Sequence, residues 1–95
     1  MTSQEIKTFF EKKGYVVEDK MKSFTDNDIY VGNELDPQNY DDYPVYLKKV
    51  CIYEINTEWI VFQPKFGGNN KTDKFETAEQ ACLFTLNFLG PPKYE

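Results

Sequence analysis

The sequence predicts a two-layer α+β domain, in which an antiparallel sheet of three to four strands lies under an N-terminal and a C-terminal helix. Three observations support this prediction: a capped amphipathic segment at the start, β-type runs in the middle, and a capped apolar segment near the end. Short connections favour antiparallel pairing, because parallel strands need long crossovers. Two helices that cover one sheet face make a two-layer domain. With 95 residues, the chain is predicted to form one domain over 1–95.

The first helix is predicted from a cap, an apolar face and a stop signal. Thr2 and Glu5 have the spacing of a capping box, in which each side chain satisfies a free amide of the first turn. Gly14 follows as the stop, because glycine adopts the left-handed conformation after a last turn. The apolar side chains at helical spacing are Ile6, Phe9 and Phe10.

The middle of the chain predicts three or four strands. β-branched and aromatic residues gather at 15–17, 29–31, 45–55 and 59–62. The last two runs read as a hairpin around a polar break at 56–58. Neither face of 45–55 is purely apolar, so the pattern leaves open which face meets the core. Trp59 is expected to anchor the core, and residues 67–71 are expected to form a polar loop.

The last helix is the clearest element. Thr77 and Gln80 form a second predicted capping box, and Phe75 ahead of it is suited to act as a hydrophobic staple. Gly90 and the prolines after it end the helix. Apolar residues recur between these limits, so the helix is expected to be mostly buried against the sheet. The exposed face of that sheet would then carry Tyr, Lys and Glu side chains.

Composition argues against several classes of function. The chain has no His and no Arg, and its eleven Lys face sixteen acidic residues, for a net charge of −5. Residues 1–42 hold five Lys and ten acids, so the negative balance lies in the first half. Such a surface repels phosphate backbones and attracts basic partners, although an excess of this size also keeps a small domain soluble. We expect no direct nucleic-acid binding and no membrane association.

The sequence indicates a protein that is not an enzyme and carries no cofactor. Histidine, the commonest general base and metal ligand, is missing. Cys51 and Cys82 lie in no metal-ligand spacing and are expected to be buried, reduced thiols. A small enzyme with one of them as nucleophile is a third class, which would require a thiol that reacts at neutral pH. Asp26 and Asp28 resemble the start of a calcium loop, but the glycine and the closing glutamate do not follow.

An acidic, tyrosine-rich loop is the strongest candidate for a binding site. Tyrosine supplies rigid contact area with a polar hydroxyl, and carboxylates pair with Lys or Arg on a basic partner. The alternative is a solvated loop whose tyrosines fold back onto the sheet. The candidate partner-binding residues are Glu34, Asp36, Tyr40, Asp41, Asp42, Tyr43 and Tyr46.

The second half of the chain resembles small bacterial immunity proteins of polymorphic, contact-dependent toxin systems. The resemblance lies in the aromatic strand 59–62, the Gly-Gly-Asn-Asn loop at 67–70, and the Phe-Glu-Thr-Ala-Glu-Gln-Ala-Cys start of a helix at 75–82. It covers about residues 50–89. It implies a cytoplasmic, non-enzymatic inhibitor, or antitoxin, of one cognate toxin domain, often a nuclease.

The charge pattern leads independently to a similar hypothesis. Nucleases present basic clefts, and an acidic protein can occupy such a cleft and compete with substrate. In this hypothesis the aspartates of the loop supply charge, and Tyr40 and Tyr43 supply buried area. The alternative is an acidic phage-type inhibitor that mimics nucleic acid and binds a host DNA-binding enzyme. The oligomeric state is left open by the sequence.

Overall fold

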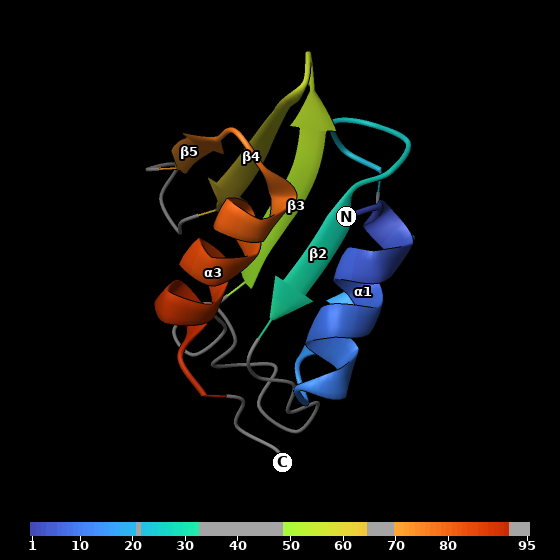
Figure 1. Cartoon of the computed structure of the whole chain (residues 1–95), viewed down its shortest axis with the longest axis vertical. Coiled ribbons are helices and arrows are strands. Elements are labelled where there is room, and N and C mark those ends of the chain that lie inside the picture. The colour runs from blue at the N-terminus through green and yellow to red at the C-terminus, as the bar shows by residue number, and fades with distance from the viewer. Residues whose placement is uncertain (21, 33–48, 65–69, 92–95) are drawn as a thin grey trace.

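The computed structural model describes residues 1–20, 22–32, 49–64 and 70–91 (Figure 1). Within them, two helices and five strands follow one another along the chain. In order, these elements are α1 (Ser3–Lys12), β1 (Val16–Glu18), β2 (Ile29–Gly32), β3 (Lys49–Ile55), β4 (Glu58–Gln63), β5 (Lys71–Phe75) and α3 (Ala78–Leu89).

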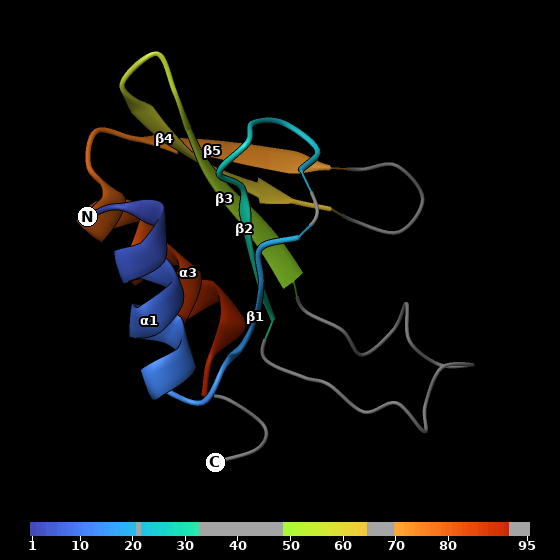
Figure 2. The same cartoon turned by 90° about the vertical axis from the view of Figure 1, so that its right-hand side faces the viewer.

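The fold is α+β, as the sequence predicts. The five strands form one antiparallel sheet in the order β1-β2-β3-β4-β5, so every strand pairs with its neighbours in sequence. Figure 2 shows α1 and α3 side by side on the same face of this sheet. The layers therefore have the predicted arrangement, with one helix near each end of the chain.

The predicted count of three to four strands is wrong, because β5 adds a fifth. Lys71, expected to end a polar loop, begins this strand instead, and Gln63 is its register partner on β4. Four of the five β5 residues are polar, so no apolar alternation marks the strand in the sequence. Pairing with β4 supplies the backbone hydrogen bonds that the local pattern does not predict.

Both helix caps form as predicted. The Thr2 hydroxyl accepts a hydrogen bond from the Glu5 amide at 3.2 Å, and a Glu5 carboxylate oxygen accepts one from the Thr2 amide at 2.7 Å. Thr77 and Gln80 repeat this exchange at the start of α3. Gly90 closes α3 with φ of 73°, a conformation that favours glycine.

The main core lies between the helices and the sheet. Ile6 and Phe10 of α1 are fully buried there, and Trp59 is 9% exposed, as expected of a core anchor. The Phe10 and Tyr15 rings form a T-shaped pair with 5.7 Å between centroids. Val50 and Ile52 of β3 both belong to this core, so their side of the strand faces the helices. The sequence pattern of 45–55 alone leaves open which side of the strand is buried.

Candidate functional site

The candidate loop of the sequence analysis lies outside the described residues. This applies to the whole predicted set: Glu34, Asp36, Tyr40, Asp41, Asp42, Tyr43 and Tyr46. Other candidate sites lie in the described part of the chain.

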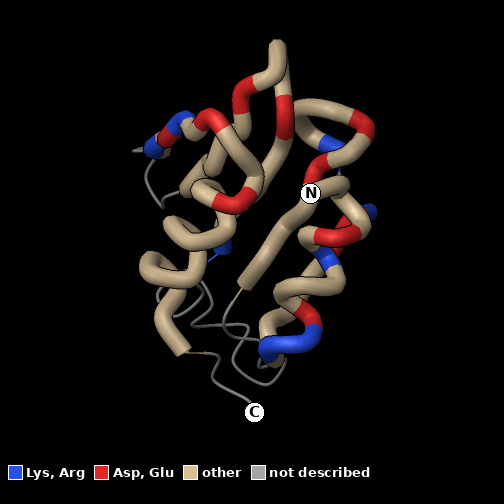
Figure 3. The backbone as a smooth tube through the Cα atoms, in the orientation of Figure 1, with Lys and Arg blue, Asp and Glu red and all other residues tan. Residues whose placement is uncertain are grey.

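Carboxylates from both halves of the chain gather at one end of the molecule, which we call the acidic end. The β3–β4 turn, the loop between β1 and β2, and the first turns of both helices meet there (Figure 3). Each of its carboxylates is exposed. The acidic end consists of Glu5, Asp26, Glu54, Glu58, Glu76 and Glu79.

Local structure brings these carboxylates together. Trp59 of β4 pairs with Phe75, the last residue of β5, so Glu58 and Glu76 are the residues adjacent to this pair at the same end of the two strands. The amino group of Met1 lies 3.8 Å from a Glu79 carboxylate oxygen, which joins the starts of α1 and α3. Carboxylates in a first turn are also favoured by the positive end of the helix dipole.

Reasoning from net charge alone misses most of the acidic end. Residues 43–95 are neutral as a whole, yet they contribute four of its six carboxylates. The usable signals were local. Glu79 lies inside a predicted first turn with Glu76 just ahead of it, and Glu54 and Glu58 flank a predicted hairpin turn.

A loop between β1 and β2 is held by one buried carboxylate. Asp28 is fully buried and accepts three hydrogen bonds: from the Phe24 amide at 2.7 Å, the Thr25 amide at 2.8 Å and the Thr25 hydroxyl at 2.7 Å. The Tyr30 hydroxyl donates to Ser23 Oγ at 2.7 Å and ties the same loop to β2. Residues 22–28 thereby receive a defined conformation, and we call them the Asp28 loop.

The Asp28 loop covers an aromatic cluster on the sheet face opposite the helices (Figure 2). The Phe24 ring stacks on Tyr53 with 4.5 Å between centroids and 8° between planes, and it meets Phe62 at 5.0 Å. Phe24 remains 44% exposed, and Ile55 on the same face is 46% exposed. The face carries Tyr and Lys as expected, but its centre is apolar and buried.

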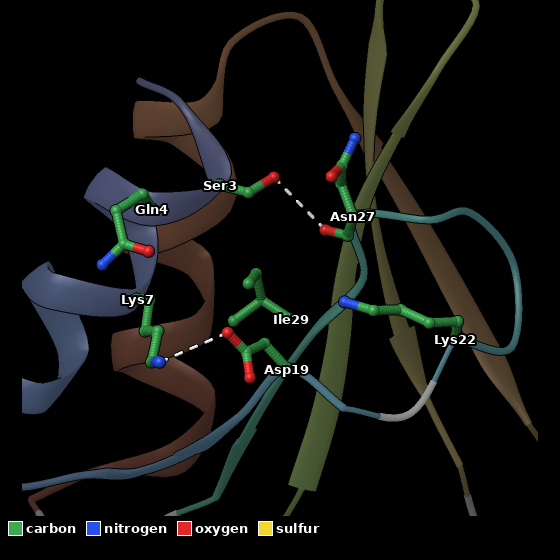
Figure 4. Close-up of a pocket in the computed structure, with 7 residues that line it drawn as sticks. All are labelled: Ser3, Gln4, Lys7, Asp19, Lys22, Asn27 and Ile29. Atoms are coloured by element: carbon green, nitrogen blue, oxygen red, sulfur yellow. Dashed lines mark hydrogen bonds and ion pairs between the residues drawn. The ribbon is translucent and has the colours of Figure 1, made fainter.

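A cavity of about 210 Å³ opens between α1 and the segment that leads into the Asp28 loop. Figure 4 shows its wall joined at two points: Lys7 Nζ lies 3.2 Å from Asp19 Oδ2, and the Ser3 hydroxyl donates to the Asn27 carbonyl at 3.2 Å. The Lys7 ammonium lowers the pKa of Asp19. Lys22 extends into the same cavity. The cavity wall therefore offers positive and negative charges to a small polar group.

The two cysteines are free, buried thiols. Burial raises the pKa of Cys51 to about 12, with the charge of Asp28 as a further cause, and burial raises the pKa of Cys82 to about 11. Both groups are therefore protonated at neutral pH. A nucleophilic cysteine needs the opposite shift, because the thiolate is the reactive form.

Comparisons with protein-family models, curated proteins and solved structures give no match. Among the described residues, no three metal-ligating side chains converge. Neither helix there is long and apolar enough to cross a membrane.

Proposed function

We propose that this protein is a cytoplasmic immunity protein that binds and neutralises a cognate toxin domain, a basic nuclease being the best fit. It acts by occupying a basic surface with its carboxylates, and it performs no reaction of its own. The observation that carries the proposal is the charge distribution: six exposed carboxylates form the acidic end, and the sequence of 34–42 adds three aspartates and one glutamate.

The mechanism is competition for a basic cleft. Exposed carboxylates speed the encounter with a positively charged partner and orient it at low salt. Tyr40 and Tyr43 then supply buried contact area, the part of an interface that carries most affinity. The resemblance of residues 50–89 to immunity proteins supports the same class of function.

The first test is recovery of the partner from the native host with the tagged chain, washed at low and then at high salt. A basic toxin fragment that elutes with salt, and whose activity the pure chain then inhibits, is the expected result. Recovery of a host DNA-binding enzyme would favour the nucleic-acid mimic instead. If no basic protein elutes with salt, the proposal is wrong.

A matched pair of variants tests the loop. Asp41→Lys with Asp42→Lys should weaken binding of the recovered toxin domain about tenfold and flatten its salt dependence. Glu11→Lys with Glu18→Lys changes the net charge equally, at two exposed positions outside both the loop and the acidic end. Equal losses of affinity in the two double variants would contradict a role for the loop and would leave only long-range electrostatic attraction.

A further inference from the structure

The Asp28 loop presents one aromatic ring to solvent in a fixed position. One face of the Phe24 ring is stacked on Tyr53 and the ring lies tilted against Phe62, while the residue remains 44% exposed, so we take the face away from Tyr53 as its outward face. The three hydrogen bonds to Asp28 include the Phe24 amide itself. The ring is therefore held in place before any partner arrives, which lowers the entropic cost of binding.

Two exposed carboxylates belong to the elements that form this aromatic cluster, the Asp28 loop and β4. Asp26 follows Phe24 by two residues in the same loop and is exposed. Glu58 pairs with Ile55, and because Ile60 pairs with Tyr53, Glu58 is the diagonal neighbour of Tyr53 on the same sheet face. Diagonal neighbours lie about 7–8 Å apart. No ion pair among the described residues uses either carboxylate.

We propose that the outward face of Phe24 binds an arginine side chain of a basic protein partner, with Asp26 and Glu58 as ion-pair acceptors and Ile55 as an apolar contact beside it. A guanidinium is planar, weakly hydrated and able to stack on an aromatic ring while its edge donates to carboxylates. A lysine ammonium is compact and strongly hydrated, so it gains less at such a site. This inference rests on the proposed function for the class of partner.

The experiment is an NMR titration of the full chain with two blocked tripeptides of equal charge, Gly-Arg-Gly and Gly-Lys-Gly. The arginine peptide should bind about threefold more tightly, as expected for a cation on an exposed ring, and should shift the ring signals of Phe24 and Tyr53. Equal affinity for the two peptides overturns the proposal. The proposal is also overturned if the chemical-shift changes centre on Glu76 and Glu79 and the signals of Phe24 do not move.

Variants separate binding from the covering role of Phe24. Phe24→Leu retains much of the apolar cover over Tyr53 but has no π face, so the preference for arginine should disappear. Phe24→Tyr retains the π face and should retain the preference. Asp26→Asn combined with Glu58→Gln should weaken the binding of both peptides to the same extent. A preference that survives in Phe24→Leu would contradict the assigned contact.

The two proposals fail in different ways. A preference for arginine without any basic protein in the salt eluate would refute the immunity function and leave the arginine site standing. A toxin domain that elutes with salt, together with equal affinity for the two peptides, would support the immunity function and refute the arginine site.

Discussion

The two faces of the sheet are buried by different means. On the face that carries the helices, thirteen buried residues of the described chain form one cluster under two capped helices, and aliphatic, alanine and cysteine side chains make up most of it. On the opposite face, the described residues include four buried ones in a cluster, two of them tyrosines, and the Asp28 loop covers this cluster through Phe24. The comparison suggests a division of roles: helix packing supplies most of the stability, and the hydrogen-bonded loop presents groups to a partner.

The largest expected effect contrasts Phe10 with Phe24. Phe10→Ala removes a fully buried ring from the helix side and should lower the free energy of unfolding by about 3–5 kcal/mol. Phe24→Ala removes a ring that is nearly half exposed and should cost about 1 kcal/mol. Urea unfolding of the two variants measures both losses. Similar values would mean that the two faces contribute equally to stability.

The second prediction concerns the buried carboxylate. Asp28→Ala leaves the amides of Phe24 and Thr25 without their acceptor and should cost about 2–3 kcal/mol. Asp28→Asn retains one acceptor oxygen and should cost less. Urea unfolding shows which of the two variants loses more free energy of unfolding. If Asp28→Ala proves as stable as the wild type, the loop is not held by this side chain.

The third prediction uses one thiol on each face. The folded-state pKa values of Cys51, about 12, and Cys82, about 11, lie above the value of about 8.5 expected in the unfolded chain. Their contribution to stability is therefore complete below about pH 8.5 and is lost as the pH rises toward the folded values. At pH 10 each thiol should account for about 1–2 kcal/mol of lost stability.

Urea unfolding between pH 7.5 and 10.5 tests this dependence. Cys51→Ala and Cys82→Ala should each flatten the alkaline decline relative to the wild type, whatever their stability at pH 7.5. Labelling of the native protein with a thiol reagent should also be slow at both positions. Rapid labelling of Cys51 alone would show that the loop opens its face more readily than α3 opens the other.

The smallest expected effect concerns Ile55. Ile55→Ser removes an apolar side chain that is 46% exposed at the end of β3, and it should change the free energy of unfolding by no more than about 0.5 kcal/mol. The same variant should weaken binding of the arginine tripeptide. A large loss of stability would place Ile55 in the structural cluster rather than at its border.

The sequence predicts well where local rules decide the structure. Both capping boxes form, Gly14 and Gly90 follow the helices with positive φ, and β4 ends at Gln63, just before Pro64. These features depend on a few neighbouring residues. Strand β5 depends on β4 for its hydrogen bonds, and for that reason its own polar sequence gives no indication of a strand.

The surface is harder to predict, because it is assembled from distant residues. Asp26 and Asp28 are two positions apart in the sequence, yet one is exposed and the other is fully buried with three donors around it. Counting both as surface charge overstates the acidity of this loop. Glu58 and Glu76 show the reverse error: they are distant in a segment that is neutral as a whole, and the pairing of Trp59 with Phe75 brings them to the same end of β4 and β5.

The strand order has a consequence for how the chain acquires its structure. Each of the five described strands pairs only with its neighbours in sequence, so the sheet can grow by adding one adjacent strand at a time, a topology that favours rapid folding. The helix layer, in contrast, needs contacts between residues that are distant in sequence. The Tyr15 hydroxyl, for example, donates a hydrogen bond to the Gly90 carbonyl and joins the two ends of the fold. During synthesis, we therefore expect the helix-bearing face of the sheet to be covered by α1 alone until α3 emerges. Pulse-labelling hydrogen exchange should show protection in β2–β4 before protection in α3.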